Sequence, residues 1–217
     1  MISMVNTTLF FDLDDTLYPN TNGLWGAIRA RMSVYMHERV GIPVEEIQQI
    51  RQFYFETYGT TLRGLQIHYQ VNPTDYLAYV HDLPLQSYLQ PDPDLRSLLT
   101  SLPQPKWIFT NADDAHARRV ITAVGLDNCF EGIIDVKAIG YHCKPDPQAY
   151  QLALDLAGER FAQHCVLLDD SPRNLAPAYQ MGFTTVLIGN KEPNPVAHYS
   201  LARVHDLPQT IPQLWES

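Results

Sequence analysis

Near its N-terminus the chain reads Thr7-Thr8-Leu9-Phe10-Phe11-Asp12-Leu13-Asp14-Asp15-Thr16. The first five residues are apolar or β-branched, a composition that predicts a short buried strand. The acidic and polar residues that follow are typical of a loop rather than of a continuing strand. The sequence therefore places two carboxylates, Asp12 and Asp14, just beyond the end of a buried strand.

The segment from Gly23 to about Tyr88 has the periodicity of helices instead. Apolar residues recur at helical spacing in a first run that ends at Gly41 and in a second, opened by Pro43, that ends at Gly59. Two shorter helices are expected over residues 62–69 and 74–80. Because the segment contains no convincing strand pattern, we expect it to form a small helical unit of its own.

After Pro93, short strand and helix patterns alternate. Strands are expected at residues 107–109, 132–136, 165–168 and 184–188, and helices at 94–101, 113–124, 147–157 and from near Asn174 to Met181. The last helix is started near Asn174 because Pro177 is tolerated in a first turn but not in a helix interior. Such alternation predicts a parallel sheet with helices on both faces. Residues 191–217 are rich in proline, and we assign them no regular structure.

Charge and composition exclude several classes of protein. Lys and Arg number 15 against 24 Asp and Glu, for a formal net charge of −9. A field of that sign repels nucleic-acid polymers but allows a small phosphorylated ligand beside a local cation. No apolar run approaches the roughly 18 residues of a membrane span, and residues 1–8 lack the features of a signal peptide. The three cysteines have no CxxC spacing, which favours buried free thiols over a zinc site. We expect a cytoplasmic protein.

Polar side chains follow four of the expected strands. They are Asp12 and Asp14 after the first, Thr110 and Asn111 after the second, Lys144 after the third, and Asp169 and Asp170 after the fourth. In an open parallel sheet, ligands bind beyond the carboxyl ends of the strands, so these groups are expected to converge. Singly, each has a simpler interpretation: Thr110 as a helix N-cap, Lys144 as a solvated surface lysine, and Asp12 with Asp14 as turn residues.

Together these residue types suit phosphoryl transfer. Carboxylates with a hard divalent cation form a site of the Mg²⁺ type, and the metal lets an anionic nucleophile approach an anionic phosphate. Thr110, Asn111 and a helix N-terminus can bind phosphate oxygens, while Lys144 both binds phosphate and offsets the developing negative charge. Two aspartates two residues apart can divide the work, one attacking phosphorus and the other moving the proton.

The order Asp12-x-Asp14-x-Thr16, Thr110, Lys144-Pro145, Asp169-Asp170 resembles the four motifs of the haloacid dehalogenase superfamily of phosphohydrolases, and the resemblance spans Leu9 to Ile188. It implies that Asp12 forms an aspartyl-phosphate, and that Asp14 protonates the leaving oxygen and then activates water. It also implies Mg²⁺ held by the Asp12 carboxylate, the Asp14 backbone carbonyl and an acid of the fourth motif. Of the two candidates for that acid we prefer Asp170. Asp169 and Thr16 are then expected to contact the metal ligands rather than the metal itself.

The same resemblance implies the domain organisation. Residues 1–19 and 89–217 are expected to form a Rossmann-like catalytic core, and residues 20–88 an inserted all-helical cap. The stretch 10–19, and residues 168–171 followed by Asn174, resemble the pyrimidine 5′-nucleotidase branch more closely. That branch implies hydrolysis of nucleoside 5′-monophosphates, with pyrimidines preferred.

Other functions stay open on the sequence. The same motifs serve phosphatases and phosphomutases for other small phosphometabolites, such as phosphoglycolate or sugar phosphates. A phospho-accepting signalling module or a non-catalytic binding module is the alternative of a different class. A dehalogenase is disfavoured because such relatives lack the second acid that Asp14 supplies. The tyrosines of the helical segment could line a nucleobase site, but a small helical unit needs them for its own core.

Overall fold

The computed structural model describes residues 7–216. Residues 1–6, on which part of the signal-peptide expectation rests, and Ser217 lie outside that range. Packing contacts divide the chain into two compact units. One contains the chain up to Pro19 and from Leu89 onward, and the other is Asn20–Tyr88.

The larger unit is built on a six-stranded sheet within the described residues. Its strands are β1 (Thr8–Phe11), β2 (Lys106–Phe109), β3 (Gly132–Ile134), β4 (Cys165–Asp169), β5 (Thr184–Ile188) and β6 (Tyr199–Leu201). Their order is β3-β2-β1-β4-β5-β6, and every neighbouring pair is parallel. The two central strands are β1 and β4, and Phe10 of β1 lies opposite Trp107 of β2 and Leu167 of β4. This confirms the predicted α/β class.

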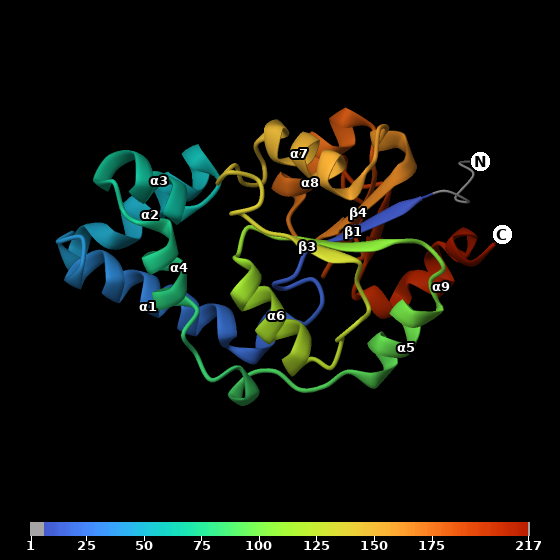
Figure 1. The fold of residues 1–217 in the computed structure, drawn as a ribbon, viewed down its shortest axis with the longest axis horizontal. Helices are drawn as coiled ribbons and strands as arrows, with labels where there is room; N and C mark the ends of the chain where they lie inside the picture. The colour runs from blue at the N-terminus through green and yellow to red at the C-terminus, as the bar shows by residue number, and fades with distance from the viewer. Residues whose placement is uncertain (1–6, 217) are drawn as a thin grey trace. The chain divides into compact units, whose positions relative to one another are not determined.

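Helices cover both faces of this sheet. They are α5 (Pro93–Ser101), α6 (Asp114–Ala123), α7 (Pro147–Ala157), α8 (Pro172–Met181) and α9 (Leu207–Thr210). Figure 1 shows α7 and α8 on one side of the strands, and α5, α6 and α9 on the other. On the first side, Phe10 and Leu167 of the sheet pack with Tyr150 of α7 and Leu175 of α8 in one buried cluster. Burial of such side chains is the main contribution to the stability of this unit.

Helix α8 differs from the prediction. It begins at Pro172 rather than near Asn174, which places Pro177 inside the helix. Pro172 suits a first helical position because its missing N–H would have no partner there. Pro177 leaves the carbonyl four residues earlier without its helical donor. The helix continues past it because Leu175 and Ala178 are fully buried.

One strand boundary was also wrong, and one segment without an assignment has regular structure. Strand β3 ends at Ile134 instead of Val136, since the next carboxylate, Asp135, accepts the backbone N–H groups of Asp114 and Ala138. The proline-rich C-terminal segment, to which no regular structure was assigned, contains β6, α9 and the short 3-10 turns η4 (Val204–Asp206) and η5 (Pro212–Trp215). Strand β6 has only three residues and is defined by its pairing with β5, which no local pattern reveals.

The regular structure in the described residues of the smaller unit is all helical, as predicted. It comprises η1 (Asn20–Asn22), α1 (Leu24–Glu38), α2 (Val44–Tyr58), α3 (Thr61–Tyr69), α4 (Pro73–Val80) and η2 (Leu85–Ser87). Tyr35, Tyr54 and Tyr76 are buried, and the rings of Tyr35 and Tyr76 meet edge to face with centroids 5.0 Å apart. These three tyrosines therefore belong to the core of this unit, whereas Tyr69 is 43% exposed.

Two further observations concern the whole described chain. Cys129, Cys143 and Cys165 are all buried and free. Among residues 7–216, no helix combines the length and the hydrophobicity that crossing a lipid bilayer requires.

Candidate active site

Three carboxylates from two adjacent strands meet at one edge of the sheet. Asp12 directly follows β1, and its N–H donates to the carbonyl of Leu168 in β4 over 2.8 Å. Asp169 ends β4 and Asp170 follows it. One carboxylate oxygen from each of Asp12, Asp169 and Asp170 lies within 4.8 Å of the others. The parallel pairing of β1 with β4 thus brings distant parts of the sequence together at the carboxyl ends of these strands.

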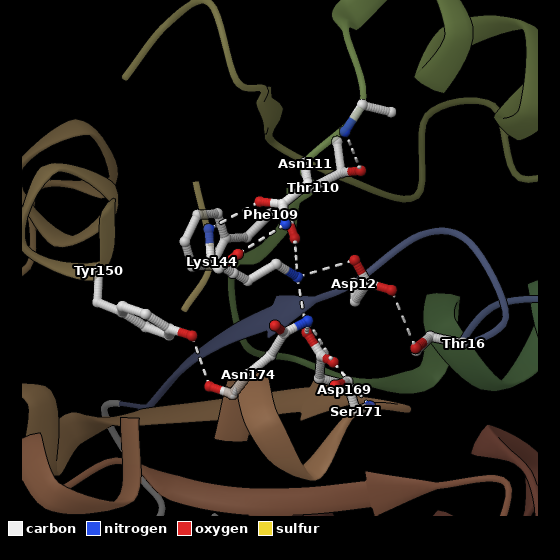
Figure 2. Close-up of polar contacts among 11 residues, drawn as sticks. Asp12, Thr16, Phe109, Thr110, Asn111, Lys144, Tyr150, Asp169, Ser171 and Asn174 are labelled. Atoms are coloured by element: carbon white, nitrogen blue, oxygen red, sulfur yellow. Dashed lines mark hydrogen bonds and ion pairs between the residues drawn. The ribbon is translucent and has the colours of Figure 1, made fainter. Parts of the chain in front are cut away.

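Lys144 supplies the positive charge of this cluster. Its side chain is fully buried, and Nζ donates to Asp12 Oδ1 at 2.8 Å, Asp169 Oδ2 at 2.6 Å and the Phe109 carbonyl at 2.8 Å. Figure 2 shows the ammonium group between the two carboxylates. All three N–H bonds of the ammonium group therefore have an acceptor. The interpretation of Lys144 as a solvated surface lysine is wrong.

Asn111 fixes the backbone that carries Lys144. Its Nδ2 donates to the Lys144 carbonyl at 2.9 Å, and its Oδ1 accepts the Lys144 N–H at 2.8 Å. This reciprocal pair ties the end of β2 to the loop before α7 (Figure 2). The side-chain amide of Asn111, predicted to bind phosphate, is thus engaged in positioning Lys144.

Asp169 is the most fully bonded of the three acids. Besides the Lys144 ammonium, it accepts the N–H of Ser171 at 2.9 Å, and Nδ2 of Asn174 at 3.0 Å and 3.2 Å to its two oxygens. It is completely buried, whereas Asp170 is only partly buried. Asp169 therefore orients its neighbours, and Asp170 is the more accessible carboxylate of the fourth motif.

The charges of the cluster perturb one another. Burial raises the pKa of Asp12, which Lys144 opposes and the nearby Asp169 and Asp170 reinforce. Burial, with repulsion from Asp169 and Asp15, raises the pKa of Asp170 to about 7. Burial would lower the pKa of Lys144, but Asp12 and Asp169 outweigh it and raise that pKa above its ordinary value. Three carboxylates share one ammonium, so the site has an excess of negative charge and all-oxygen donors, which fit a hard divalent cation.

Asp14 lies beside this cluster in a different environment. The Tyr18 hydroxyl donates to Asp14 Oδ1, and Nε2 of His116 lies 3.0 Å from the same oxygen. The Asp14 side chain is 20% exposed, so the carboxyl is reachable from outside. Thr16 Oγ1 donates a hydrogen bond to Oδ2 of Asp12, the predicted nucleophile, over 3.3 Å (Figure 2).

Thr110 follows β2 and is buried. Its N–H donates to the Ile134 carbonyl at 3.1 Å, and its hydroxyl oxygen accepts the N–H of Ala112 at 3.0 Å. The N-cap of α6 is Asp113, whose side chain accepts the His116 N–H, so the interpretation of Thr110 as that helix cap is wrong. Its hydroxyl hydrogen can still be donated to a ligand.

Sequence reasoning missed two residues of this site, His116 and Tyr18. Tyr18 lies four residues after Asp14, a spacing that can bring two side chains together in a helical turn. His116 lies in the first turn of the helix that follows β2, at the same edge of the sheet as Thr110. A titratable residue in the first turn of that helix is the signal that the sequence offers for His116.

Comparisons with known proteins identify the family of this chain. The model of the haloacid dehalogenase-like hydrolase family matches residues 7–182. Phosphate metabolism protein 8 of Saccharomyces cerevisiae is 30% identical over 195 aligned positions, which cover 82% of this chain and 60% of the yeast protein. The chain thus spans about 60% of the length of that relative.

Solved structures share the fold. A magnesium-bound HAD hydrolase from Bacillus subtilis matches with a TM-score of 0.64 and 17% identity, covering 94% of this chain and 97% of the other. A HAD phosphatase from Thermococcus onnurineus gives 0.61 and 18%, with 94% and 96% covered. The L-2-haloacid dehalogenase of Xanthobacter autotrophicus gives 0.60 and 17%, with 94% and 98% covered. At such identities the likeness concerns the fold.

Proposed function

The chain belongs to the haloacid dehalogenase-like hydrolase family, and from that premise we propose that it is a Mg²⁺-dependent phosphomonoester hydrolase acting through an aspartyl-phosphate. The observation that carries the proposal is the position of Asp12. Its carboxylate belongs to the three-acid cluster and accepts a hydrogen bond from the buried ammonium group of Lys144. Burial raises the pKa of Asp12, and Lys144 opposes that rise, so the lysine favours the ionised form that can attack phosphorus.

The reaction has two steps on the side chains of this site. An Asp12 oxygen attacks phosphorus while the ester P–O bond breaks, and Asp14 gives its proton to the leaving oxygen. Water then attacks the phosphorus of the aspartyl-phosphate, Asp14 takes the proton of that water, and the bond to Asp12 breaks. Phosphate leaves, and both aspartates return to their starting states.

The acid cluster is the proposed Mg²⁺ site. The ligands from this chain would be the Asp12 carboxylate, the Asp170 carboxylate and the backbone carbonyl of Asp14. Asp169 is not assigned as a ligand, because its oxygens already accept hydrogen bonds from Lys144, Ser171 and Asn174. It would orient the residues around the ion. The bound ion supplies positive charge that lets the anionic phosphate approach anionic carboxylates.

Phosphate binding is assigned to residues at the end of β2 and to Lys144. The Thr110 hydroxyl can donate to a phosphate oxygen, and the Lys144 charge favours an anion close to Asp12. Asn111 contributes by holding the Lys144 backbone through its side chain. Residues 1–19 and 89–217 then form the catalytic core, and residues 20–88 act as a cap that selects the substrate.

The proposed substrates are nucleoside 5′-monophosphates, with pyrimidines preferred, in the cytoplasm. Two relatives support phosphate chemistry, since one is named for phosphate metabolism and one is a HAD phosphatase. Dehalogenases share the fold, but breaking a carbon–halogen bond leaves no oxygen to protonate, so the Asp14 carboxyl favours a phosphate ester. A phosphatase or phosphomutase for another small phosphometabolite, such as phosphoglycolate or a sugar phosphate, is the second candidate.

Phosphate release tests the reaction. The purified protein should hydrolyse p-nitrophenyl phosphate with Mg²⁺, lose this activity in EDTA and regain it when Mg²⁺ is restored. Asp12→Asn should be folded and inactive, whereas Asp155→Asn, the same change at an exposed position of α7, should be fully active. Absence of phosphate release from this ester and from all nucleotides and metabolites tried would contradict the proposal. Comparing UMP and CMP with AMP, GMP, phosphoglycolate and sugar phosphates tests the substrate preference.

A further inference from the structure

We infer that His116, together with Tyr18, is a positioning residue that orients the carboxyl of Asp14 for proton transfer to the leaving oxygen. The inference rests on the proposed function, because it assigns Asp14 the role of acid and base. It adds that the geometry of this acid is set by an imidazole from the helix after β2.

Two contacts of Asp14 fall on the same carboxylate oxygen. Tyr18 and His116 both approach Oδ1, the tyrosine through its hydroxyl and the histidine through Nε2 at 3.0 Å. Two contacts on one oxygen restrict rotation of the carboxyl group about its Cβ–Cγ bond. Since a protonated carboxyl carries its hydrogen on one oxygen, the hydroxyl that Tyr18 donates to Oδ1 favours placing that hydrogen on Oδ2, and His116 does the same in the tautomer that carries its hydrogen on Nε2. Oδ2 is then the atom that gives the proton and takes it back.

Burial distinguishes the two sides of this contact. The His116 side chain has no exposed surface, whereas the Asp14 side chain is 20% exposed. The imidazole is therefore shielded from a bound substrate and acts on it only through Asp14. For this reason His116 is a positioning residue and not a proton donor to the substrate.

The origin of the two partners couples Asp14 to the rest of the site. Tyr18 comes from the loop after β1, and His116 from the first turn of α6, which follows the strand end that carries Thr110. The N-cap of that helix, Asp113, holds the His116 N–H at 3.4 Å. The segment after β2 thus holds both Thr110, the proposed hydrogen-bond donor to phosphate, and His116, which orients Asp14. Such fixed positions are what preorganised catalysis requires.

Leaving-group dependence separates this role from a merely structural one. p-Nitrophenolate leaves without much protonation, whereas an alkoxide leaves only with a proton from an acid. His116→Leu should therefore lower kcat/KM for the best alkyl phosphate substrate by about tenfold or more, since general acid catalysis contributes on the order of 10²–10⁴-fold. With p-nitrophenyl phosphate the loss should be less than about threefold by the same reasoning. His116→Gln, which keeps a donor near the Nε2 position, should recover most of the alkyl activity.

Matched variants control for the loss of a histidine–aspartate or tyrosine–aspartate contact. His205→Leu breaks a similar pair, in which Nε2 lies 3.1 Å from Asp92 Oδ2, and should leave the ratio of the two activities unchanged. Tyr18→Phe should shift the ratio of alkyl phosphate activity to p-nitrophenyl phosphate activity in the same direction as His116→Leu. It provides a second test if His116→Leu does not fold. Tyr35→Phe removes a comparable hydroxyl bonded to Asp75 at 2.8 Å and should not shift it.

The outcomes are distinct. Equal losses on both esters in His116→Leu and Tyr18→Phe, or no loss in either, would overturn the inference and leave the proposed function intact. A wild-type protein that releases no phosphate from either ester, or an Asp12→Asn variant as active as wild type, would instead overturn the proposed function itself.

Discussion

Nζ of Lys144 lies 2.6 Å from Oδ2 of Asp169, and neither side chain is exposed to solvent. Removing two such charges from water is unfavourable, and the pair is tolerated only where further hydrogen bonds satisfy both groups. Here the ammonium also bonds Asp12 and the Phe109 carbonyl, and the carboxylate also accepts Ser171 and Asn174. The acidic cluster therefore depends on one lysine for its charge balance.

Replacing that lysine should destabilise the whole larger unit. Lys144→Met leaves Asp12 and Asp169 buried without their cation, and breaking a buried pair from one side costs about 3–5 kcal/mol. Urea unfolding measures this loss, and phosphatase activity should vanish in the same variant. Lys137→Met is the control, because Lys137 pairs with Asp113 at 3.1 Å but is 34% exposed, and such a pair contributes about 1 kcal/mol or less. Equal losses in the two variants would contradict this account of the cluster.

Mg²⁺ should stabilise the protein through Asp170. A ligand that binds only the folded state raises its stability by about 2.7 kcal/mol at 100 times its dissociation constant. We expect Mg²⁺ to raise the Tm of the wild type and to have little effect on Asp170→Asn. Without metal, Asp170→Asn should melt above the wild type, because it removes one of three mutually repelling carboxylates.

Thermal melts with and without Mg²⁺ provide the measurement. Asp155→Asn, which removes an exposed carboxylate from α7, should keep the full Mg²⁺ response. A response of Asp170→Asn as large as that of the wild type would show that this carboxylate is not a ligand.

The sequence predicted the strand ends but not the side-chain partners. Apolar runs locate the strands because burial on both faces excludes polar residues from them, and parallel pairing then brings Asp12 and Asp169 to one edge. Whether Lys144 is buried against those acids depends on the path of the loop before α7, which Asn111 fixes by contacts between distant residues. Local patterns carry no information about such contacts.

The same reasoning explains what was missed. The His116 contact with Asp14 joins the turn after β1 to a helix 102 positions away, so only the fold reveals it. Pro177 shows the opposite error, in which a local rule was applied too strictly. Its effect on α8 is outweighed by the burial of Leu175 and Ala178.

Asp92 should make stability depend on pH in the acid range. It is the N-cap of α5, accepts the Leu95 N–H at 2.9 Å and lies 3.1 Å from His205 Nε2. Burial alone would raise the pKa of Asp92, but the Leu95 and His205 contacts outweigh it and lower that pKa. Because the folded-state pKa is depressed, the stabilisation is present above the unfolded value of about 3.9 and is lost as pH falls through the folded value.

Melting curves of Asp92→Ala and wild type between pH 5 and pH 3 test this dependence. The variant should be less stable by about 1 kcal/mol at pH 5, the usual contribution of an N-cap, and the difference should shrink toward pH 3. Asp92→Asn keeps a cap oxygen and should retain part of the stability with a weaker pH dependence. A difference between Asp92→Ala and wild type that is constant from pH 5 to pH 3 would contradict the assignment.

Two helical glycines of the smaller unit should respond in opposite directions to alanine. A Cβ built on Gly64 of α3 would lie 2.1 Å from Tyr54 Cγ and 2.6 Å from Tyr54 Cβ, so Gly64→Ala forces α2 and α3 apart. Overpacking of this kind costs about 1–3 kcal/mol. Gly26 of α1 has no atom within 4 Å of such a Cβ, and Gly26→Ala should stabilise the protein by about 0.5–1 kcal/mol, because glycine is a poor helix former. Urea unfolding of both variants, followed by helical circular dichroism, measures the two changes, and a shift of the same sign in both would show that the Tyr54 contact does not restrict residue 64.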